Sequence, residues 1–588
     1  MRGALKYLTR IMPIMFGLAV FLFFGYAYKF HLHYQEQLQM FLFTSDYFSD
    51  LIGHPGGLVD YLSTFFVQFY YVAWLGALII ALLLVLLQQQ VFKLSNLSRK
   101  GSTFWPLTYI PSILFGGLLC DENFLLAGLL AANITLAAVQ LYSIIKKPLI
   151  RLSFGIIAIP LLFWAVGGIF WIFPLLCIVL EWRHFKQFSL VQWIISIVGA
   201  ILLTVLSFEI TIQFQQFPIS RLWCGMCYNR YPVVAYYPFL VIWACLLLIP
   251  LVISFLPAEL KKALKIIVLS SQILILLIFA KILIGKTANW AKEKIMAYDY
   301  YVRMEQWVKV ISLANHQDPD SPLSVACLNL ALSKSGNMGD CMFRYFQNGT
   351  EGLLPTFQRD FTMPFIAGEV YYHLGLLNTS MRYAFEAMEA IPDYKKSSRA
   401  IKRMAEVNLL NGEYKVASKY LHLLQHTFFY REWETETLKC IDDPALIEKN
   451  PEWATLKKFR ITKDFLFSEQ EKDQMLGMLV THYTANKMAY EYLMAYTLLN
   501  KDLGHLIQYF PLGKELGYKE IPAHYQEALV LAWTQKPSDG RSLPWPINLA
   551  VKQNFKNYVK RYSSNFSTAQ QMNDGFSQTY WYYFHFRK

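Results

Sequence analysis

Charged residues are scarce in this chain. Asp, Glu, Lys and Arg make up 16% of its 588 residues, whereas soluble proteins average roughly 25%. The shortage is confined to the first half, because apolar stretches crowd residues 1–286 and almost none follows. Eight cysteines are too few and too scattered for a disulfide scaffold. The net charge of +13 comes without a nucleic-acid-binding motif, so no nucleic acid is expected as a partner.

The sequence also lacks the signatures of common soluble enzymes. It contains no P-loop, no G-x-S-x-G, no H-E-x-x-H and no dinucleotide-binding fingerprint. If the protein is a catalyst, its chemistry therefore belongs to the connections between the apolar stretches.

The apolar stretches predict a helical membrane domain. A spanning helix needs about 20 mostly apolar residues, and nine stretches approach that length. We expect an all-α fold, with a polytopic transmembrane helical bundle of about nine spans in residues 1–286 and a second domain in residues 287–588. The fifth and sixth stretches abut at Gly167-Gly168, which fits either a tight hairpin or a re-entrant pair. The predicted spans are Ile11–Tyr28, Phe69–Leu87, Phe104–Leu119, Phe124–Ile145, Leu152–Val166, Gly167–Leu180, Leu190–Phe208, Tyr236–Leu256 and Ile266–Ile284.

Lysine and arginine in short loops mark the cytoplasmic side of a membrane protein. Here every second connection is basic, as one consistent cytoplasmic side requires. The N-terminus is then inside and the second domain outside, and the first stretch is interpreted as an uncleaved anchor. The basic residues are Arg2, Lys6, Arg10, Lys93, Arg99, Lys100, Lys146, Lys147, Arg151, Arg183, Lys186, Lys261, Lys262 and Lys265.

The longest outward connection, residues 29–68, predicts a helix on the membrane surface. Its aromatic and aliphatic residues from Phe41 to Ile52 fall near helical spacing. His54-Pro55-Gly56-Gly57 then breaks the helix, and a second amphipathic turn leads into the next span.

Charged residues on the outward connections are the candidates for chemistry. A carboxylate can deprotonate an acceptor hydroxyl, and arginine can hold and stabilise a departing phosphate. The set suits a phosphate-bearing substrate. The structural alternatives are solvated helix ends, a polar capping turn and anchors to lipid headgroups. The acidic candidates are Glu36, Asp46, Asp121 and Glu122, and the basic candidates are Arg221 and Arg230.

This layout resembles the GT-C class of membrane glycosyltransferases, which transfer sugars from polyprenyl-phosphate carriers. The resemblance rests on a long acidic first outward loop and a second acidic site between the third and fourth spans. It implies that Glu36 or Asp46 is the base, and that Asp121 and Glu122 form a second acidic site, with a divalent metal as a cofactor that site could hold. The class usually has an acidic pair in the first loop, where this chain has Gln35-Glu36-Gln37.

A short cysteine motif, Cys224-Gly225-Met226-Cys227, lies on the fourth outward connection. It fits a structural disulfide or an inert pair, a redox-active dithiol, or a zinc site. Zinc would need a second pair of ligands at the usual spacing, and the sequence has none.

The second half contains a repeated phrase. Leu376-Leu377-Asn378, Leu409-Leu410-Asn411 and Leu498-Leu499-Asn500 share it, and the first two copies lie 33 residues apart, close to the 34-residue tetratricopeptide period. Each phrase is expected to end one helix and lead into a second. The stretch resembles tetratricopeptide (TPR) repeats, which implies an α-solenoid with a concave face for a protein partner. The alternative is a helical cap on the membrane domain.

Over its full length the chain resembles a family of Bacteroidota polytopic inner-membrane proteins. The phrases HPGGLVDYL, CLNLAL, FQNGTEG, YAFEAMEAIP and QTYWYY carry this resemblance. It implies a multi-pass protein of the inner (cytoplasmic) membrane with its C-terminal domain in the periplasm.

Two functions from different classes follow. The first is a GT-C-like transferase that uses a membrane lipid, a polyprenyl-phosphate-linked sugar, as donor at the periplasmic face. The second is a non-enzymatic membrane scaffold whose TPR-like domain binds an envelope partner. A transporter is disfavoured, because the spans carry almost no charge at their centres.

Overall fold

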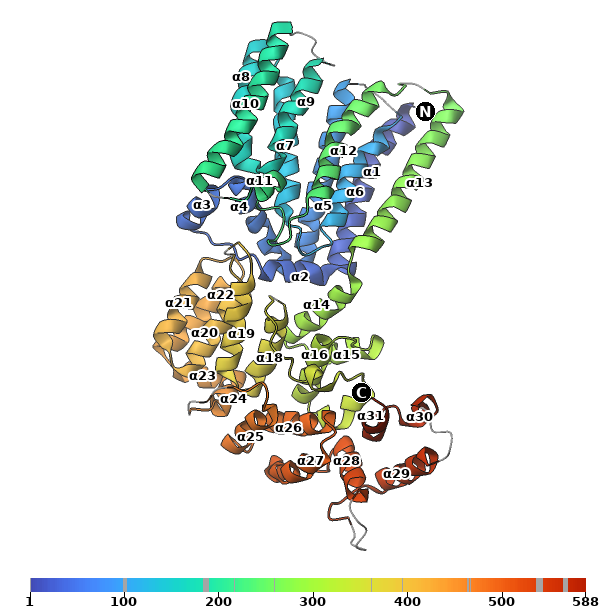
Figure 1. Ribbon diagram of the computed structural model, residues 1–588, viewed down its shortest axis with the longest axis vertical. Helices are drawn as coiled ribbons and strands as arrows, with labels where there is room; N and C mark the ends of the chain where they lie inside the picture. Colours follow the sequence, from blue (N-terminus) through green and yellow to red (C-terminus); the bar gives the residue numbers. More distant parts are fainter. Residues whose placement is uncertain are drawn as a thin grey trace. The chain divides into compact units, whose positions relative to one another are not determined.

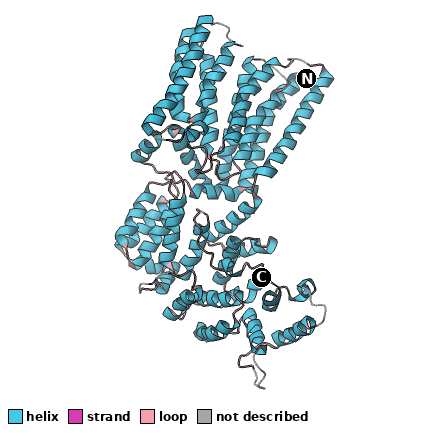
Figure 2. Cartoon of the chain, viewed as in Figure 1, coloured by secondary structure: helices cyan, strands magenta, loops and turns pink. Residues whose placement is uncertain are grey.

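The computed structural model is helical and divides into two units. It describes residues 2–98, 103–182, 190–215, 217–257, 260–360, 362–393, 395–462, 465, 467–535, 543–563 and 569–587. The predicted basic residues Arg99, Lys100, Arg183 and Lys186 lie outside these ranges. Within them, extended pairing is limited to one isolated antiparallel bridge, Phe124 with Asn229. The expected all-α class is confirmed for the described chain (Figure 2).

The first unit comprises Met1–Glu293 together with two segments from much later in the chain, Pro392–Lys395 and His426–Phe429. The second of these segments contacts the helical bundle directly, because the ring of Phe429 stacks on that of Tyr71 with 4.8 Å between the ring centroids. Its helices are α1 (Arg2–Leu22), η1 (Phe23–Ala27), α2 (Lys29–Gln37), α3 (Ser45–Ile52), α4 (Gly57–Val67), η2 (Gln68–Tyr71), α5 (Ala73–Ser98), η3 (Trp105–Tyr109), α6 (Ile110–Leu118), α7 (Leu126–Ile144), α8 (Pro148–Val166), η4 (Gly168–Trp171), α9 (Ile172–Leu180), α10 (Leu190–Gln215), α11 (Ile219–Cys224), α12 (Tyr236–Phe255) and α13 (Lys262–Thr287) (Figure 1).

Seven helices in the described ranges are long and apolar enough to cross a membrane, which fits a membrane protein. Two predicted spans form shorter helices, Ile110–Leu118 and Gly168–Leu180, so nine crossings remain a prediction. The seven helices are Tyr7–Ala27, Ala73–Ser95, Leu126–Ile144, Pro148–Val166, Ser196–Gln213, Tyr236–Phe255 and Lys262–Thr287.

Burial differs strongly between these helices. Half of the residues in the most apolar stretch of α5 are buried, and α5 packs against α1, α7 and α12. In the most apolar stretch of α13 only 6% of the residues are buried, and in that of α1 only 11% are buried. Apolar side chains that find no protein neighbour on a spanning helix face lipid, so α1 and α13 border the bundle.

The long connection after α1 folds into α2, α3 and α4. The predicted break at His54–Gly57 is confirmed, because α3 ends at Ile52 and α4 begins at Gly57. Gly56 adopts a φ of 82°, which favours glycine. It also lies against the Gly167 backbone, and its N–H donates to the carbonyl oxygen of Trp164 at 2.9 Å. A side chain at Gly56 would crowd the Sγ of Cys227 at 3.2 Å.

Arg151 differs from its predicted role as a loop residue. It lies in α8, its side chain is fully buried, and its guanidinium pairs with the carboxylate of Glu181. Tyr142 donates a hydrogen bond to the same carboxylate at 3.0 Å. Buried charges need such partners, so Arg151 ties three helical segments together.

The second unit comprises Lys294–Ile391, Lys396–Gln425 and Tyr430–Lys588, and α14 (Trp290–Arg303) crosses its start. Its other helices are α15 (Trp307–His316), α16 (Pro322–Lys334), α17 (Met338–Cys341), η6 (Met342–Arg344), η7 (Gly349–Gly352), α18 (Met363–Leu374), α19 (Leu377–Ala390), α20 (Ser398–Asn411), α21 (Tyr414–Gln425), α22 (Arg431–Asp442), α23 (Ala445–Lys449), α24 (Pro451–Phe459), α25 (Lys472–His482), α26 (Lys487–Leu499), α27 (Leu503–Tyr509), η8 (Phe510–Leu516), α28 (Ala523–Thr534), α29 (Leu549–Tyr562), α30 (Ala569–Phe576) and α31 (Tyr580–Phe586).

The repeated phrase has two different structural settings. Leu409-Leu410-Asn411 ends α20, and Gly412 follows with a φ of 82°, as expected. For Leu376-Leu377-Asn378 the expectation was wrong, because α18 already ends at Leu374 and Leu377 opens α19. The cause is Gly375, whose φ of 92° ends the helix one residue before the phrase begins.

Candidate functional site

Two connections between the helices of the first unit meet in an antiparallel contact at one end of the bundle. The N–H of Leu125 donates to the carbonyl oxygen of Tyr228 at 2.9 Å, and the N–H of Arg230 donates to that of Asn123 at 2.8 Å. The structure thus brings the predicted second acidic site, between α6 and α7, beside the predicted basic residue Arg230.

Arg230 links this contact to α2. The residue is 3% exposed, and its guanidinium donates to Oε1 of Gln35 at 2.8 Å and to the carbonyl oxygen of Glu122 at 3.4 Å. Gln35 in turn donates to the same carbonyl oxygen at 2.8 Å. Burial lowers the pKa of Arg230 below its usual value. Glu36, the next residue of α2, is also buried.

The two acidic residues at the tip differ in their partners. Oδ1 of Asp121 accepts hydrogen bonds from the backbone and side-chain nitrogens of Asn123 at 2.9 and 3.0 Å, so Asp121 closes its own turn. The carboxylate of Glu122 pairs with the ammonium of Lys292 in α14. Burial alone would raise the pKa of Glu122, but Lys292 outweighs it and the pKa lies below the usual value. Glu122 is therefore a carboxylate at neutral pH.

Glu293, next to Lys292, holds the start of α2. Its carboxylate accepts the backbone N–H groups of Phe30 and His31 at 2.8 and 2.9 Å. A negative charge is favourable at a helix N-terminus, but burial raises the pKa of Glu293 to about 7. Burial also lowers the pKa of His31 to about 4. Sequence reasoning missed Glu293, since nothing local marks a residue more than 260 positions from its partners.

A polar cavity of about 330 Å³ opens beside these groups. It contains both acidic candidates of the tip, Asp121 and Glu122, together with two lysines, Lys286 and Lys292, that the sequence had not singled out. Carboxylates and ammonium groups in one cavity can bind a hydroxyl and an anion side by side. Its complete lining is Cys120, Asp121, Glu122, Asn123, Lys286, Thr287, Ala288, Asn289, Trp290 and Lys292.

The other predicted residues are not among those lining this cavity. Arg221 pairs with Asp393 at 2.8 Å and donates to the carbonyl oxygen of Met226 at 2.8 Å. Asp46 is exposed in the first turn of α3, and its neighbour Ser45 contacts its carboxylate at 3.4 Å. The proposed roles of these residues in catalysis and phosphate binding stay predictions.

A second charged cluster lies around Asp60 of α4. Its side chain is 8% exposed and its carboxylate pairs with the ammonium of Lys395 at 2.6 Å, while Nε2 of His54 lies 3.7 Å away. Burial opposes the charge on Lys395, but Asp60 outweighs it and raises the pKa of the amine. Removal of one partner of such a pair would leave the other charge buried and unpaired, which is strongly destabilising.

The cysteine motif consists of two buried free thiols. Cys224 accepts a hydrogen bond from Nδ2 of Asn229 at 3.1 Å, and Cys227 lies 3.6 Å from the carbonyl oxygen of Gly56. Burial raises the pKa of Cys224 to about 11 and that of Cys227 well above its usual value. Redox-active thiols need the opposite shift, so this environment suits the inert alternative.

The described residues offer no cluster of three His, Cys, Asp or Glu side chains suited to a metal ion. Asp121 and Glu122 are the acids of the polar cavity, and both are already engaged by Asn123 and Lys292. This donor set does not fit the expected divalent metal.

These features define an all-helical membrane protein with a charged cavity at one end of its bundle and a second helical unit. Residues 4–587 match the family of unknown function DUF6057, and the chain belongs to that family. No curated protein and no solved structure matches the chain.

Proposed function

We propose that the protein is a glycosyltransferase of the GT-C type, which takes a sugar from a polyprenyl-phosphate carrier at the charged end of its bundle. The observation that supports this is the polar cavity, where Asp121 and Glu122 meet Lys286 and Lys292. The lysines replace the predicted arginines as phosphate ligands in this proposal, because Lys286 and Lys292 line the cavity and Arg221 and Arg230 do not.

The chemistry assigned to the cavity is one displacement. The acceptor hydroxyl oxygen attacks the anomeric carbon of the sugar, the bond from that carbon to the phosphate oxygen breaks, and the polyprenyl phosphate leaves. The hydroxyl proton passes to a carboxylate of Asp121 or Glu122, while Lys286 and Lys292 stabilise the leaving phosphate. Glu36, the base that the resemblance implies, is not one of the residues that line the cavity, so this proposal gives it no step. No step uses a metal.

The setting of the reaction follows from the resemblances. We place the protein in the inner membrane of a Bacteroidota species, with nine crossings, a cytoplasmic N-terminus and the second unit in the periplasm. The cavity and the second unit then share the periplasmic side. A reporter fused after Lys588 that is active only in the cytosol would contradict this topology.

The test is sugar transfer by the purified full-length protein in liposomes. The donor is a polyprenyl-phosphate hexose with a radiolabelled sugar, and the acceptor is a fraction of the cell envelope. Asp121→Asn or Glu122→Gln should lower the rate by about 10²–10⁴-fold if that group takes the proton. Asp50→Asn, which changes an exposed acid of α3, is the matched control and should leave it unchanged. Rates within about twofold of wild type for both cavity variants would contradict the mechanism.

The scaffold remains the second candidate because of the helix pairs in the second unit. α18 packs against α19 and α20 against α21, and α19 also packs against α20, the stacking that helical-repeat proteins use to present a binding face. Its test is co-purification from cell envelopes. One partner that is retained by full-length protein and by Glu122→Gln, but lost when residues 299–588 are deleted, would favour the scaffold.

A further inference from the structure

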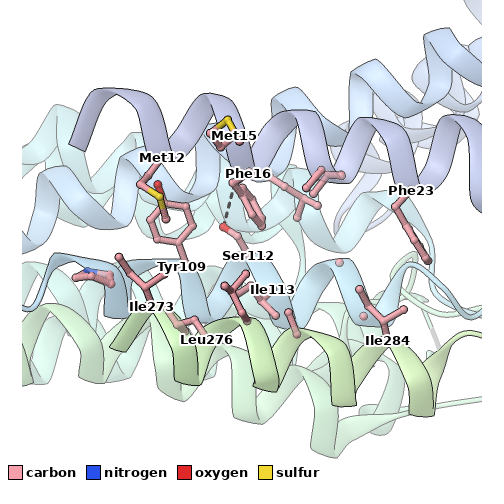
Figure 3. A pocket seen from close by; sticks show the side chains of 18 of the residues that line it. Met12, Met15, Phe16, Phe23, Tyr109, Ser112, Ile113, Ile273, Leu276 and Ile284 are labelled. Atoms are coloured by element: carbon pink, nitrogen blue, oxygen red, sulfur yellow. Dashed lines mark hydrogen bonds between the residues drawn. The ribbon is translucent and has the colours of Figure 1, made fainter. Parts of the chain in front are cut away.

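The first unit presents apolar surface along its spanning helices. Figure 3 shows one part of this surface, a hollow between α1, α6 and α13 whose lining is almost all carbon and sulfur. On α5 the exposed apolar side chains recur at every fourth residue, so they share one face of the helix. These side chains are Trp74, Leu78, Leu82 and Leu86. Exposed apolar side chains on a spanning helix face hydrocarbon, so the lipid-facing surface of α5 begins at Trp74.

Aromatic rings gather just before that point, and two of them come from far along the chain. Phe69 and Tyr71 belong to η2, which directly precedes α5. Between ring centroids, Phe428 lies 5.9 Å and Phe429 6.1 Å from Phe69, and Phe429 lies 4.8 Å from Tyr71. The segment His426–Phe429, which belongs to the first unit, is therefore held beside the start of a spanning helix.

Phe428 is the exposed member of this group. The residue is 60% exposed, whereas Thr427 before it is 6% exposed. Its ring contacts those of Phe69 and Phe429, and the rest of the ring surface has no cover within the described chain. Burial of such a surface is favourable, so this position suits an apolar environment that the chain itself does not supply.

The group of rings continues to α3. The backbone N–H of Phe43 donates to the carbonyl oxygen of His426 at 2.9 Å, and α3 has no buried residue. Its apolar and polar side chains lie on opposite faces, as in a helix that lies in a membrane interface. The apolar face holds Tyr47, Phe48, Leu51 and Ile52, and the polar face holds Ser45, Asp46, Ser49 and Asp50. Successive ring contacts run from Phe69 through Phe65, Phe41 and Tyr61 to Phe48.

We propose that the segment His426–Phe429 contacts the bilayer, with the ring of Phe428 among the lipid chains just below the headgroups. Lipid is the occupant because the group of rings continues directly from the end of a spanning helix, and aromatic residues concentrate at that level of a membrane. The residues that flank the two rings, His426 and Arg431, are polar and exposed, which suits the headgroup region. This contact does not depend on the chemistry assigned to the polar cavity.

The depth of Phe428 is measured with the full-length protein in phosphatidylcholine liposomes. The fluorescent amino acid acridonylalanine replaces Phe428, or Phe385 as the matched control, since Phe385 of α19 is 48% exposed. Quenching by a lipid with a doxyl group near the top of its acyl chain should exceed quenching by aqueous iodide at position 428. The order should reverse at position 385. Equal quenching by iodide at the two positions would overturn the proposal.

The same label distinguishes lipid from a protein partner. These liposomes contain no other protein, so position 428 should already be protected from iodide in them. Protection in native envelopes but not in the liposomes would mean that a protein covers Phe428, and it would overturn the choice of lipid.

A photo-crosslink tests the ring without a fluorescent label. Phosphatidylcholine with a diazirine in its acyl chain should label the peptide that carries residues 426–429 in the wild-type protein. Phe428→Ser should reduce this labelling by about fivefold, whereas Phe428→Leu, which stays apolar, and Phe385→Ser should retain it. Unchanged labelling in Phe428→Ser would overturn the role of the ring. Equal losses in Phe428→Ser and Phe428→Leu would indicate a packing defect and would also overturn the proposal.

Discussion

Replacement of Lys395 by methionine tests how the first unit is held together. Lys395 Nζ lies 2.6 Å from the carboxylate of Asp60, which is 5% exposed. Lys395→Met keeps the apolar stem and removes the ammonium, so Asp60 is left as a buried carboxylate. Nε2 of His54 still lies 3.7 Å from this carboxylate. Breaking a buried pair from one side costs about 3–5 kcal/mol.

The neighbouring residue supplies the control. Lys396 is exposed, so Lys396→Met should change the free energy of unfolding by no more than about 0.5 kcal/mol. Thermal unfolding of the full-length protein in detergent measures both variants, and a loss of about 3 kcal/mol corresponds to a midpoint lower by about 2–5 °C.

Repair of the pair separates this explanation from a packing defect. The double variant Asp60→Asn/Lys395→Met carries no buried charge at this point, so it should recover most of the lost stability. Equal midpoints for Lys395→Met and Lys396→Met, or no recovery in the double variant, would refute the reasoning.

Three further predictions concern buried titratable groups. Burial would raise the pKa of Glu369, but Arg403 and Arg399 outweigh it and hold the pKa at about 2 instead of 4.5. This shift contributes about 3 kcal/mol of stability, which is present above pH 4.5 and is lost as the pH falls towards 2. Hydrogen exchange of α18 should rise over that range in wild type, and Glu369→Gln should remove the dependence. Burial raises the pKa of Glu293 from 4.5 to about 7. The free energy of unfolding should therefore fall by about 3 kcal/mol as the pH rises from 4.5 to 7. Hydrogen exchange of α2 should become faster over this range in the wild type but not in Glu293→Gln. Cys224 and Cys227 have raised pKa values, so maleimide at pH 7 should label them only after unfolding, and rapid labelling of the native protein would contradict their burial.

Much of the fold could be predicted from local patterns. The apolar stretches predict the helices of the bundle, because hydropathy is a property of consecutive residues. The break at His54–Gly57 could be predicted for the same reason, since Pro and Gly act on their own backbone. The repeat boundary at Leu376 could not, because the phrase resembles a helix end while Gly375, just before it, ends the helix.

The candidate site could be predicted only in part. Asp121 and Glu122 were found because they interrupt an apolar hairpin, and they do line a cavity. Lys292 and Glu293 lie more than 160 residues away from the groups they contact, and no local pattern marks them. Arg221 was chosen for its charge, but Asp393 neutralises that charge in the folded protein.

By itself, the sequence determined that one half of this protein is a bundle of apolar helices and that the other half is helical and polar. Both properties depend only on residues that are neighbours in the sequence, so they can be predicted without knowledge of the fold. The tertiary structure alone decided which charges are paired and which line a cavity. The reason is that a charge responds to every group within a few ångströms, and in this chain those groups come from segments far apart in the sequence, such as α4 and Lys395.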